Sequence, residues 1–555
     1  MNRIGIIFVV SISFLLALLA LPATGHAQQP TVGAAVNAAS YAIAGLPGSG
    51  IAKGGMFIVF GTNMGPAAIE RASSFPLPTN LAGTSIKVTV SGTTTDAIIL
   101  YTRNDQVAAV MRSGTPAGTG TLTLTYNGSA SAPAAVTVVA ASFGAFTLNQ
   151  QGTGAAVILD ANNQPIDALH PAAPGQTVAL WGTGLGPVSG DETQAPPAGN
   201  LATSVEVLVG SSTAAVVYKG RAPCCVGIDQ VNFVVPQGLS GCTISVVIKI
   251  NNVVSNFATL AVSNGGPCSD PTGLTSENLQ RLQSQGNLRI GSVFLSKGTT
   301  PSFNPDGSST TLAVEAGGGS FLRVDQQELL RSQGSFNQVS IGGCVVSTFS
   351  GQSAEDPSFT APTYLDAGAS LSANGPNGSR QIPKIAGFAG AYSEAFNIPP
   401  APASFLSAGS YTVSGPGGAD VGPFQATFTI GAPLNWTNST VINIPRGQNH
   451  TIRWTGGPAN GLIVIGGTSY VLNADNTSFG ATFYCLVESN PGQFTIPSAV
   501  LLALPASSTI GFPPFQFSTG ALFVGAYIFT EFTASGLDQG YAGYVENLTQ
   551  FVNYQ

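Results

Sequence analysis

The stretch Phe60-Gly-Thr-Asn-Met-Gly-Pro66 returns 121 positions later as Trp181-Gly-Thr-Gly-Leu-Gly-Pro187. Further landmarks keep nearly the same spacing: Asn80-Leu-Ala82 corresponds to Asn200-Leu-Ala202, and Asp105-Gln-Val107 corresponds to Asp229-Gln-Val231. Self-similarity at a fixed interval is typical of a duplicated structural unit. The first half of the chain is therefore predicted to contain two copies of one domain.

Within each copy, apolar residues alternate with polar ones between Gly, Pro and Asn turns, as in 84–90 and 204–209. This period of two is typical of half-buried strands, and strands about ten residues apart suit a sandwich of two sheets. In the Gly-Thr-x-x-Gly-Pro segment the glycines permit positive φ and the proline ends the strand, so the chain can cross between sheets. A phosphate-binding role is disfavoured because neither a helix pattern nor a Lys follows.

Several strings in this region carry a resemblance: Val36-Asn-Ala-Ala-Ser-Tyr41, Pro171-Ala-Ala-Pro-Gly175, and Gly227-Ile-Asp-Gln-Val-Asn-Phe233 followed by Val235-Pro236. Together with the repeated segment they resemble an uncharacterised module of acidobacterial secreted proteins, which is similar to the IPT/TIG immunoglobulin-like domains. The resemblance covers about residues 30 to 265 and implies an immunoglobulin-like β-sandwich without a catalytic residue set. The first copy departs from the pattern around Tyr101-Thr-Arg-Asn104 and at Met111.

The composition favours an all-β chain of several domains. Its 555 residues include 69 Gly and 37 Pro, and only 8% are charged, so turns are frequent and long solvated helices are not expected. We predict tandem immunoglobulin-like sandwiches at 30–141 and 142–266, followed by two further β-sandwich-like domains with minor short helices at 267–431 and 432–555.

Local patterns predict two helices and several strands in the second half. A short helix is expected after an N-cap at Thr275 or Ser276, with Gly286 as its stop, and a second from Gln326 to Ser332. Phe424–Ile430 alternates as a strand. The apolar runs 500–505 and 521–530 are interpreted as buried strands, since both are far shorter than the ~20 residues of a membrane-spanning helix.

Residues 1–27 have the pattern of a secretory signal peptide, because Arg3 precedes an apolar run and small residues follow it up to Ala27. The protein is therefore expected to be secreted or held at the cell surface. No transmembrane span is expected after cleavage.

Cysteines in an exported chain are expected to form disulfides. Four of the six fall within 45 residues, and we expect Cys224 and Cys225 to be joined to Cys242 and Cys268. The sequence leaves the connectivity, and the roles of Cys344 and Cys485, open. Zinc is the alternative, but no C-x-x-C pair or nearby histidine supports it.

Residues suited to catalysis are sparse. Only His170 and His450 remain after signal cleavage, and both are interpreted as surface residues rather than members of a catalytic triad. A glycosidase could use two carboxylates about 5 to 9.5 Å apart. The candidates in the second half are Glu355, Asp356, Glu394, Glu488, Glu531 and Asp538, which nothing in the sequence pairs.

Two kinds of ligand site are weighed beside catalysis. The Asx-rich stretches 160–163, 304–306 and 473–476 offer oxygen ligands for calcium, although such turns form without metal. Trp181 and Trp454 are expected in the core. Trp436 is weighed between the core and an exposed platform for sugars.

The sequence predicts an exported, non-catalytic β-sandwich protein that acts as a structural or interaction module. No catalytic, cofactor or metal residues are assigned. The partner is expected to be a protein or polysaccharide surface rather than nucleic acid, because the net charge is −7 and no Lys/Arg cluster could neutralise phosphates. The alternative is a carbohydrate-active hydrolase with a carboxylate pair in the second half.

Overall fold

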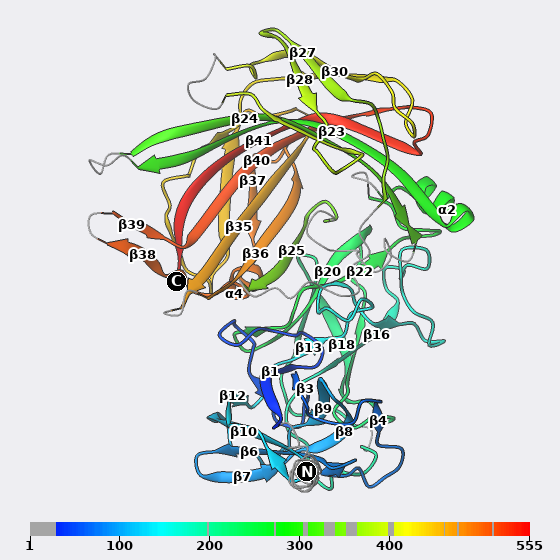
Figure 1. Cartoon of the computed structure of the whole chain (residues 1–555), viewed down its shortest axis with the longest axis vertical. Helices are drawn as coiled ribbons and strands as arrows, with labels where there is room; N and C mark the ends of the chain where they lie inside the picture. The colour runs from blue at the N-terminus through cyan, green and yellow to red at the C-terminus, as the bar shows by residue number, and fades with distance from the viewer. Residues whose placement is uncertain are drawn as a thin grey trace, which may run out of the picture.

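Strands dominate the computed structural model, which describes residues 29–196, 199–270, 274–303, 309–326, 339–350, 363–397, 404–459, 461–473, 477–512 and 515–555 (Figure 1). The two helices of this part, α2 (Ser276–Gln285) and α4 (Ser498–Leu502), are short. The predicted all-β fold class is confirmed. The predicted signal peptide lies outside the described residues.

The first module is an immunoglobulin-like sandwich. One sheet pairs β1 (Thr31–Asn37), β3 (Met56–Thr62), β9 (Gln106–Val110), β8 (Ile98–Arg103) and β4 (Glu70–Arg71) in that order. The other pairs β2 (Ile51–Ala52), β12 (Ala134–Val139), β10 (Gly118–Tyr126), β6 (Thr84–Val90) and β5 (Asn80–Leu81), with β7 (Thr93–Asp96) on β6 and β11 (Ser129–Ala130) on β10. Alternation in β6 buries Ile86, Val88 and Val90 between the sheets, as the period of two predicts.

The second module repeats this topology. Its strands pair in the order β13 (Gly144–Ala145), β16 (Thr177–Thr183), β19 (Asp229–Val234), β18 (Ser212–Arg221), β17 (Glu206–Val209), β20 (Gly241–Ile250), β22 (Ala258–Val262) and β14 (Gly154–Ala155), with β15 (Ile158–Leu159) on β16 and β21 (Val253–Val254) on β20. In both copies a two-residue strand pairs in parallel with the last strand, β2 with β12 and β14 with β22. The repeat in sequence is therefore a repeat in structure.

The Gly-Thr-x-x-Gly-Pro segment begins within β3 and β16. In the second copy Gly184 and Gly186 have φ of +107° and +120°, the left-handed backbone that glycine favours. In the first copy the positive φ falls on Asn63, at +55°, and Gly61 is required for another reason, since a Cβ there would collide with the carbonyl oxygen of Thr31. The predicted role of these glycines is therefore corrected for the first copy.

A ten-stranded sheet forms the centre of the second half (Figure 1). Its main path pairs β25 (Gly343–Ser350), β36 (Ser478–Glu488), β35 (Leu462–Leu472), β40 (Gly520–Phe532), β41 (Gln539–Tyr554), β23 (Asn287–Phe303), β24 (Ser309–Asp325) and β26 (Thr363–Tyr364). β29 (Ala391–Ala395) pairs with β24, and β33 (Asn443–Ile444) pairs with β41. The parallel pair of β23 and β41 joins segments separated by almost the whole second half of the chain.

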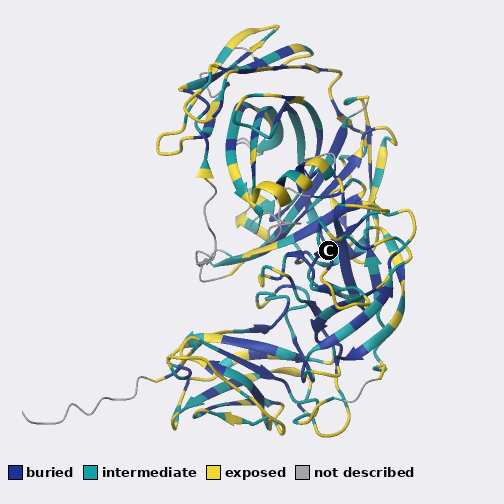
Figure 2. Cartoon of the chain, turned by 90° about the vertical axis from the view of Figure 1, so that its right-hand side faces the viewer, coloured by how far each residue is buried: buried dark blue, intermediate teal, exposed yellow. Residues whose placement is uncertain are grey.

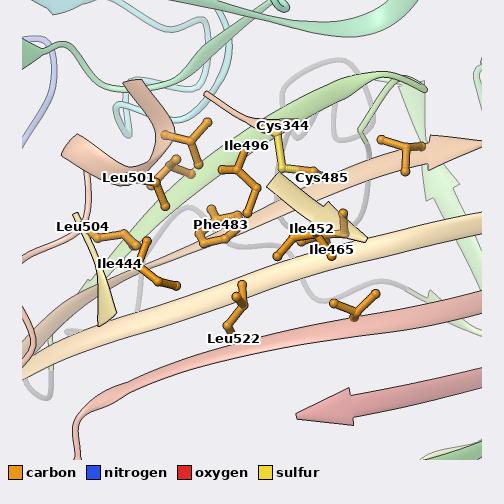
Figure 3. Packing of buried hydrophobic residues seen from close by; sticks show 14 of the residues in the cluster. Cys344, Ile444, Ile452, Ile465, Phe483, Cys485, Ile496, Leu501, Leu504 and Leu522 are labelled. Carbon is orange, nitrogen blue, oxygen red and sulfur yellow. A yellow bond between two sulfur atoms is a disulfide. The ribbon is translucent and has the colours of Figure 1, made fainter. Parts of the chain in front are cut away.

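Two smaller layers cover this sheet. One contains β28 (Gly378–Pro383), β27 (Ser370–Gly375), β30 (Gly409–Gly415) and β31 (Phe424–Ile430). The other contains β32 (Asn435–Trp436), β34 (His450–Thr455) and β37 (Gln493–Ile496), with α4 packed beside it, and a separate hairpin joins β38 (Thr509–Phe512) to β39 (Phe515–Ser518). Each layer has its own core against the shared sheet. Figure 3 shows the core that the layer of β32, β34 and β37 forms with the sheet.

This sheet corrects the division of the second half at residue 431. The position does separate the two covering layers, but strands from both sides of it belong to the same sheet. The two sandwich-like units therefore share one layer and are not two consecutive domains. The physical reason is that β23 pairs on one edge with the next strand, β24, and on its other edge with β41, which lies beyond residue 431.

Some of the local predictions for the second half are confirmed and one is wrong. α2 has Thr275 as its N-cap and the left-handed Gly286 as its C-cap, and β31 buries Phe424, Ala426, Phe428 and Ile430, as predicted. The expected strand at 500–505 is wrong, because 498–502 form α4, whereas 521–530 lies within β40 as expected. The second predicted helix lies outside the described residues except for Gln326.

The disulfides join Cys224 to Cys225, Cys242 to Cys268, and Cys344 to Cys485. The predicted pairing of Cys224 and Cys225 with Cys242 and Cys268 is therefore wrong. Cys224 and Cys225 lie in the loop between β18 and β19, whereas Cys242 is the second residue of β20 and is bonded to Cys268, which follows β22. Cys344 and Cys485, left open by the sequence, face each other across β25 and β36.

Buried residues occur in both modules and in the second half (Figure 2), and some of them connect these parts. Arg221, 3% exposed, forms an ion pair with the fully buried Asp229 and donates hydrogen bonds of 2.7 Å to the carbonyl oxygens of Gly54 and Gly186. Since Gly54 belongs to the first module, this side chain bridges both modules. Val247 and Phe257 of the second module contribute to a core of the second half.

Candidate functional site

Four aromatic rings gather on one face of the ten-stranded sheet. Tyr527 and Phe529 lie two residues apart on β40, and Tyr541 lies on β41. Phe529 and Phe294 of β23 both face Gly543 of β41, from opposite sides. Alternate residues of a strand point to the same face, so the pairing register brings the four rings together.

The rings form a connected group, here called the ring cluster. The centroids of Phe294 and Tyr527 are 5.2 Å apart with the rings stacked, those of Tyr527 and Phe529 are 5.5 Å apart, and those of Phe529 and Tyr541 are 5.9 Å apart edge to face. Gly543 makes room for them, because a Cβ there would lie 2.9 Å from the Phe294 ring and would collide with the carbonyl oxygen of Ile528. Rings over strand glycines are a known device for stabilising sheets.

Polar atoms without partners lie beside these rings. Tyr541 is 8% exposed, and among the residues that the structure describes its hydroxyl has no hydrogen-bond partner; the same holds for the buried Oε1 of Gln539. The other end of the Gln539 amide donates to Glu531 at 3.3 Å. Burial is the main cause that raises the pKa of the Tyr541 hydroxyl, the nearby carboxylate of Glu531 raises it further, and the neighbouring Gln539 side chain lowers it. Both groups are therefore uncharged polar atoms that a ligand could satisfy.

A pocket of about 560 Å³ opens beside the ring cluster. Tyr527 and Phe529 belong to both, and Ile341 and Leu462 add apolar surface. Burial raises the pKa of the Tyr527 hydroxyl. Glu488 and Asn490 line the same pocket, and both are exposed. Apolar and aromatic walls with a few polar groups are typical of ligand sites.

The predicted carboxylates are not all brought together. Glu488 and Glu531 lie on the same sheet, but strand geometry places their Cα atoms about 16 Å apart. Glu394 lies on β29, and Asp538 accepts a hydrogen bond of 2.8 Å from the backbone N–H of Arg289, which positions the start of β41. Glu355 and Asp356 lie outside the described residues.

The histidines differ from each other. His170 is exposed, with Nδ1 3.4 Å from Asp167, in agreement with its interpretation as a surface residue. His450 is not in an exposed turn but begins β34, where it is half-buried, its Nε2 has no hydrogen-bond partner, and burial lowers its pKa. The surface interpretation is therefore wrong for His450, because pairing with Ile496 covers it.

The tryptophans are mostly structural. Trp436 and Trp454 are 4% and 3% exposed in one core, and their indole N–H groups donate to Asn438 and to the carbonyl oxygen of Ser489. The alternative of an exposed sugar platform at Trp436 is therefore wrong. Trp181 is only half-buried rather than a core residue.

The turn at 160–163 is closed by its own side chain. Oδ1 of Asp160 accepts hydrogen bonds of 2.8 Å from the backbone N–H groups of Asn162 and Gln164, as an Asx turn does without metal. In the described part of the chain, no group of three or more His, Cys, Asp or Glu side chains could hold a metal ion. Residues 304–306 and 474–476 lie outside that part.

Sequence reasoning missed a row of charges across three strands. Lys297 of β23 faces Glu315 of β24 and Glu546 of β41, and its Nζ lies 3.1 Å from Glu315. Burial disfavours the charge of Glu315, but hydrogen bonds from Ser404, Leu406 and others outweigh it and lower its pKa. Burial raises the pKa of Glu546, which accepts from the N–H of Leu434 at 3.1 Å. These contacts anchor both covering layers to the sheet.

The ring cluster was also missed, although the sequence carries a signal for it. Tyr527, Phe529 and Glu531 alternate with residues of the opposite face, so a shared face could be read from β40 alone. The approach of Phe294 and Tyr541 depends on the pairing of β23, β41 and β40, which no local pattern specifies.

Comparisons with known proteins complete this description. No protein-family model matches the sequence, and no curated protein matches it. Among solved structures, the plexin A4 extracellular region (domains 1 to 8) is 12% identical, covering 40% of this chain and only 17% of that one, with a TM-score of 0.15. Domains 5–6 of the S-layer protein SbsC are 15% identical, covering 42% and 98%, with a TM-score of 0.16.

A third similar structure is the Bacteroides ovatus protein SGBP-B of a mixed-linkage glucan utilization locus, in complex with a heptasaccharide. It is 10% identical, covering 85% of this chain and 92% of that one, with a TM-score of 0.12. Scores this low do not support a common arrangement of the whole chain. The immunoglobulin-like character of the two modules follows from their own strands. Of the helices in the described residues, none has the length and hydropathy that crossing a membrane requires.

Proposed function

We propose that this chain is an exported, non-catalytic protein that binds a polysaccharide at the ring cluster and its pocket. The tandem immunoglobulin-like modules serve as a stalk, since the bridge made by Arg221 restrains them relative to each other. Export is supported by the signal-like residues 1–27 and by the three disulfides, which persist in oxidising compartments. Membership of 30–265 in the IPT/TIG-like family of acidobacterial secreted proteins is part of this proposal.

One observation carries the proposal: an open pocket whose wall of rings adjoins buried polar atoms without partners. Sugars present apolar C–H faces that stack on aromatic rings and hydroxyl groups that need hydrogen bonds. Tyr527 and Phe529 offer the rings, and Glu488 and Asn490 offer exposed polar atoms at the mouth. The site therefore matches both needs of a carbohydrate.

The test measures binding of the full-length mature chain to a panel of soluble polysaccharides by affinity electrophoresis and calorimetry. The double variant Tyr527→Ala/Phe529→Ala is expected to bind at least tenfold more weakly. Phe75→Ala is the matched control, because Phe75 is a 44% exposed ring in the first module. Equal binding by both variants, with circular dichroism showing intact folds, would overturn the proposal.

The non-catalytic part is tested on the same panel. Reducing-end release is measured over long incubations with the unmodified chain and with Glu488→Gln and Glu531→Gln. No release is expected. Release that disappears in one of the two variants would replace the proposal by the hydrolase.

A further inference from the structure

We infer that the ring-cluster site takes an uncharged glycan chain and discriminates against polyanionic glycans. The inference rests on the proposed function and specifies its ligand class. It follows from the charged side chains near the rings, from the uncharged polar atoms beside them, and from the position of the Phe529 ring between the pocket and Tyr541.

The charged side chains at the site are carboxylates. Glu488 lies in the pocket wall, and Glu531 lies two residues beyond Phe529 on the same face. Among the described residues that line the pocket there is no Lys or Arg. The sulfate or uronate groups of a bound polyanion would therefore meet Glu488 at one part of the site and Glu531 at another, without a compensating cation in the pocket wall. Repulsion from two partly hydrated charges corresponds to roughly five- to tenfold weaker binding.

The polar atoms closest to the rings are neutral. The Tyr541 hydroxyl and Gln539 Oε1 are buried without partners in the described part of the chain, and Glu531 already accepts a hydrogen bond from the Gln539 amide. Sugar hydroxyls both donate and accept hydrogen bonds, so they can satisfy a phenol and an amide oxygen together. An ammonium group can donate to the phenol oxygen and to the amide oxygen, but it cannot accept from the phenol O–H as a sugar hydroxyl can. An uncharged sugar therefore fits this set better than an amino sugar does.

The wall between pocket and hydroxyl is the ring of Phe529. It lines the pocket on one side and contacts Tyr541 edge to face on the other. The inference requires the Phe529 ring to turn aside while the sugar stays stacked on Tyr527, a side-chain rearrangement of the kind that is common on binding, and the sugar then reaches the Tyr541 hydroxyl. Tyr541 is therefore a specificity-determining residue in this inference, and Glu488 and Glu531 set the charge preference.

The experiment uses the full chain and three sets of hexasaccharides of similar length: neutral cello-, xylo- and manno-hexaose, anionic galacturonate hexamer, and cationic glucosamine hexamer. Calorimetry compares the unmodified chain with Glu488→Gln/Glu531→Gln. At least one neutral ligand is expected to bind the unmodified chain, and the readout in the Gln variant is the ratio of the neutral affinity to the galacturonate affinity, because Glu488 itself lines the pocket. Galacturonate is expected to bind the unmodified chain at least fivefold more weakly than the neutral ligand, and to regain most of that difference in the Gln variant.

Added salt provides a second readout. In 0.5 M NaCl the difference between the two proteins toward galacturonate is expected to shrink, while neutral binding stays unchanged. Tightest binding of galacturonate or of the glucosamine hexamer to the unmodified chain, lost in Tyr527→Ala/Phe529→Ala, overturns the ligand class but leaves the proposed function standing. Absence of any binding that depends on these two rings overturns both.

Discussion

Replacing Tyr541 by phenylalanine removes a single oxygen atom from the ring cluster. That oxygen is buried, no described residue forms a hydrogen bond with it, and the residue is 8% exposed. In the unfolded chain the hydroxyl forms hydrogen bonds with water. Folding removes these bonds and forms no new one in their place, which costs about 1 to 3 kcal/mol. The ring itself stays in place against Phe529. We therefore expect Tyr541→Phe to raise the free energy of unfolding by about 1 to 2 kcal/mol.

A second tyrosine provides the matched control. The Tyr411 hydroxyl is also buried, but it donates to the carbonyl oxygen of Phe405 and accepts from the N–H of Ser407, both at 2.9 Å. Tyr411→Phe leaves those two backbone groups unpaired and is expected to destabilise the protein by about 1 to 3 kcal/mol. The same atom deleted at two positions should thus change stability in opposite directions.

The assay is scanning calorimetry of the full chain with equilibrium urea unfolding of each variant. For Tyr541→Phe a rise of a few degrees is expected in the transition of the second half. The affinity for the neutral glycan is expected to fall about twofold to tenfold, the worth of one hydrogen bond. A loss of stability equal to that of Tyr411→Phe would show that the Tyr541 hydroxyl is paired, and would refute the reasoning.

Three further predictions concern the framework. Arg221→Met leaves the buried Asp229 without its cation and should destabilise the chain by about 3 to 5 kcal/mol, whereas the double variant with Asp229→Leu should lose clearly less; equal losses in urea unfolding would speak against the ion pair. Burial raises the pKa of Asp270, so the folded state holds its proton more tightly than the unfolded state; the stability of the unmodified chain relative to Asp270→Asn should therefore fall as the pH rises from the ordinary Asp value of 3.8 through the raised pKa, and a flat or rising difference in unfolding free energy would contradict this. Replacing Cys344 and Cys485 by Ala should cost about 2 to 5 kcal/mol, because their disulfide closes a long loop, and peptide mapping without reduction should find these two residues joined.

Much of the architecture was within reach of the sequence because it depends on local patterns. Alternation of apolar residues specifies a strand and the face that it buries, as in Phe424–Ile430. The repeated glycine-rich segment specifies two copies of one module, and the cap at Thr275 with the stop at Gly286 specifies α2. Each of these depends on neighbours within a few residues or on comparison of the chain with itself.

Tertiary structure alone decided which strands and side chains meet. β23 and β41 pair although about 250 residues separate them, and this register brings Phe294 to Tyr527 and Lys297 to Glu546. A period of two tells which residues share a face but carries no information about the neighbouring strand, because any strand with the same alternation satisfies the same backbone hydrogen bonds. The pairing is selected by the packing of the whole sheet beneath its two covering layers, and the ring cluster exists only once that choice has been made.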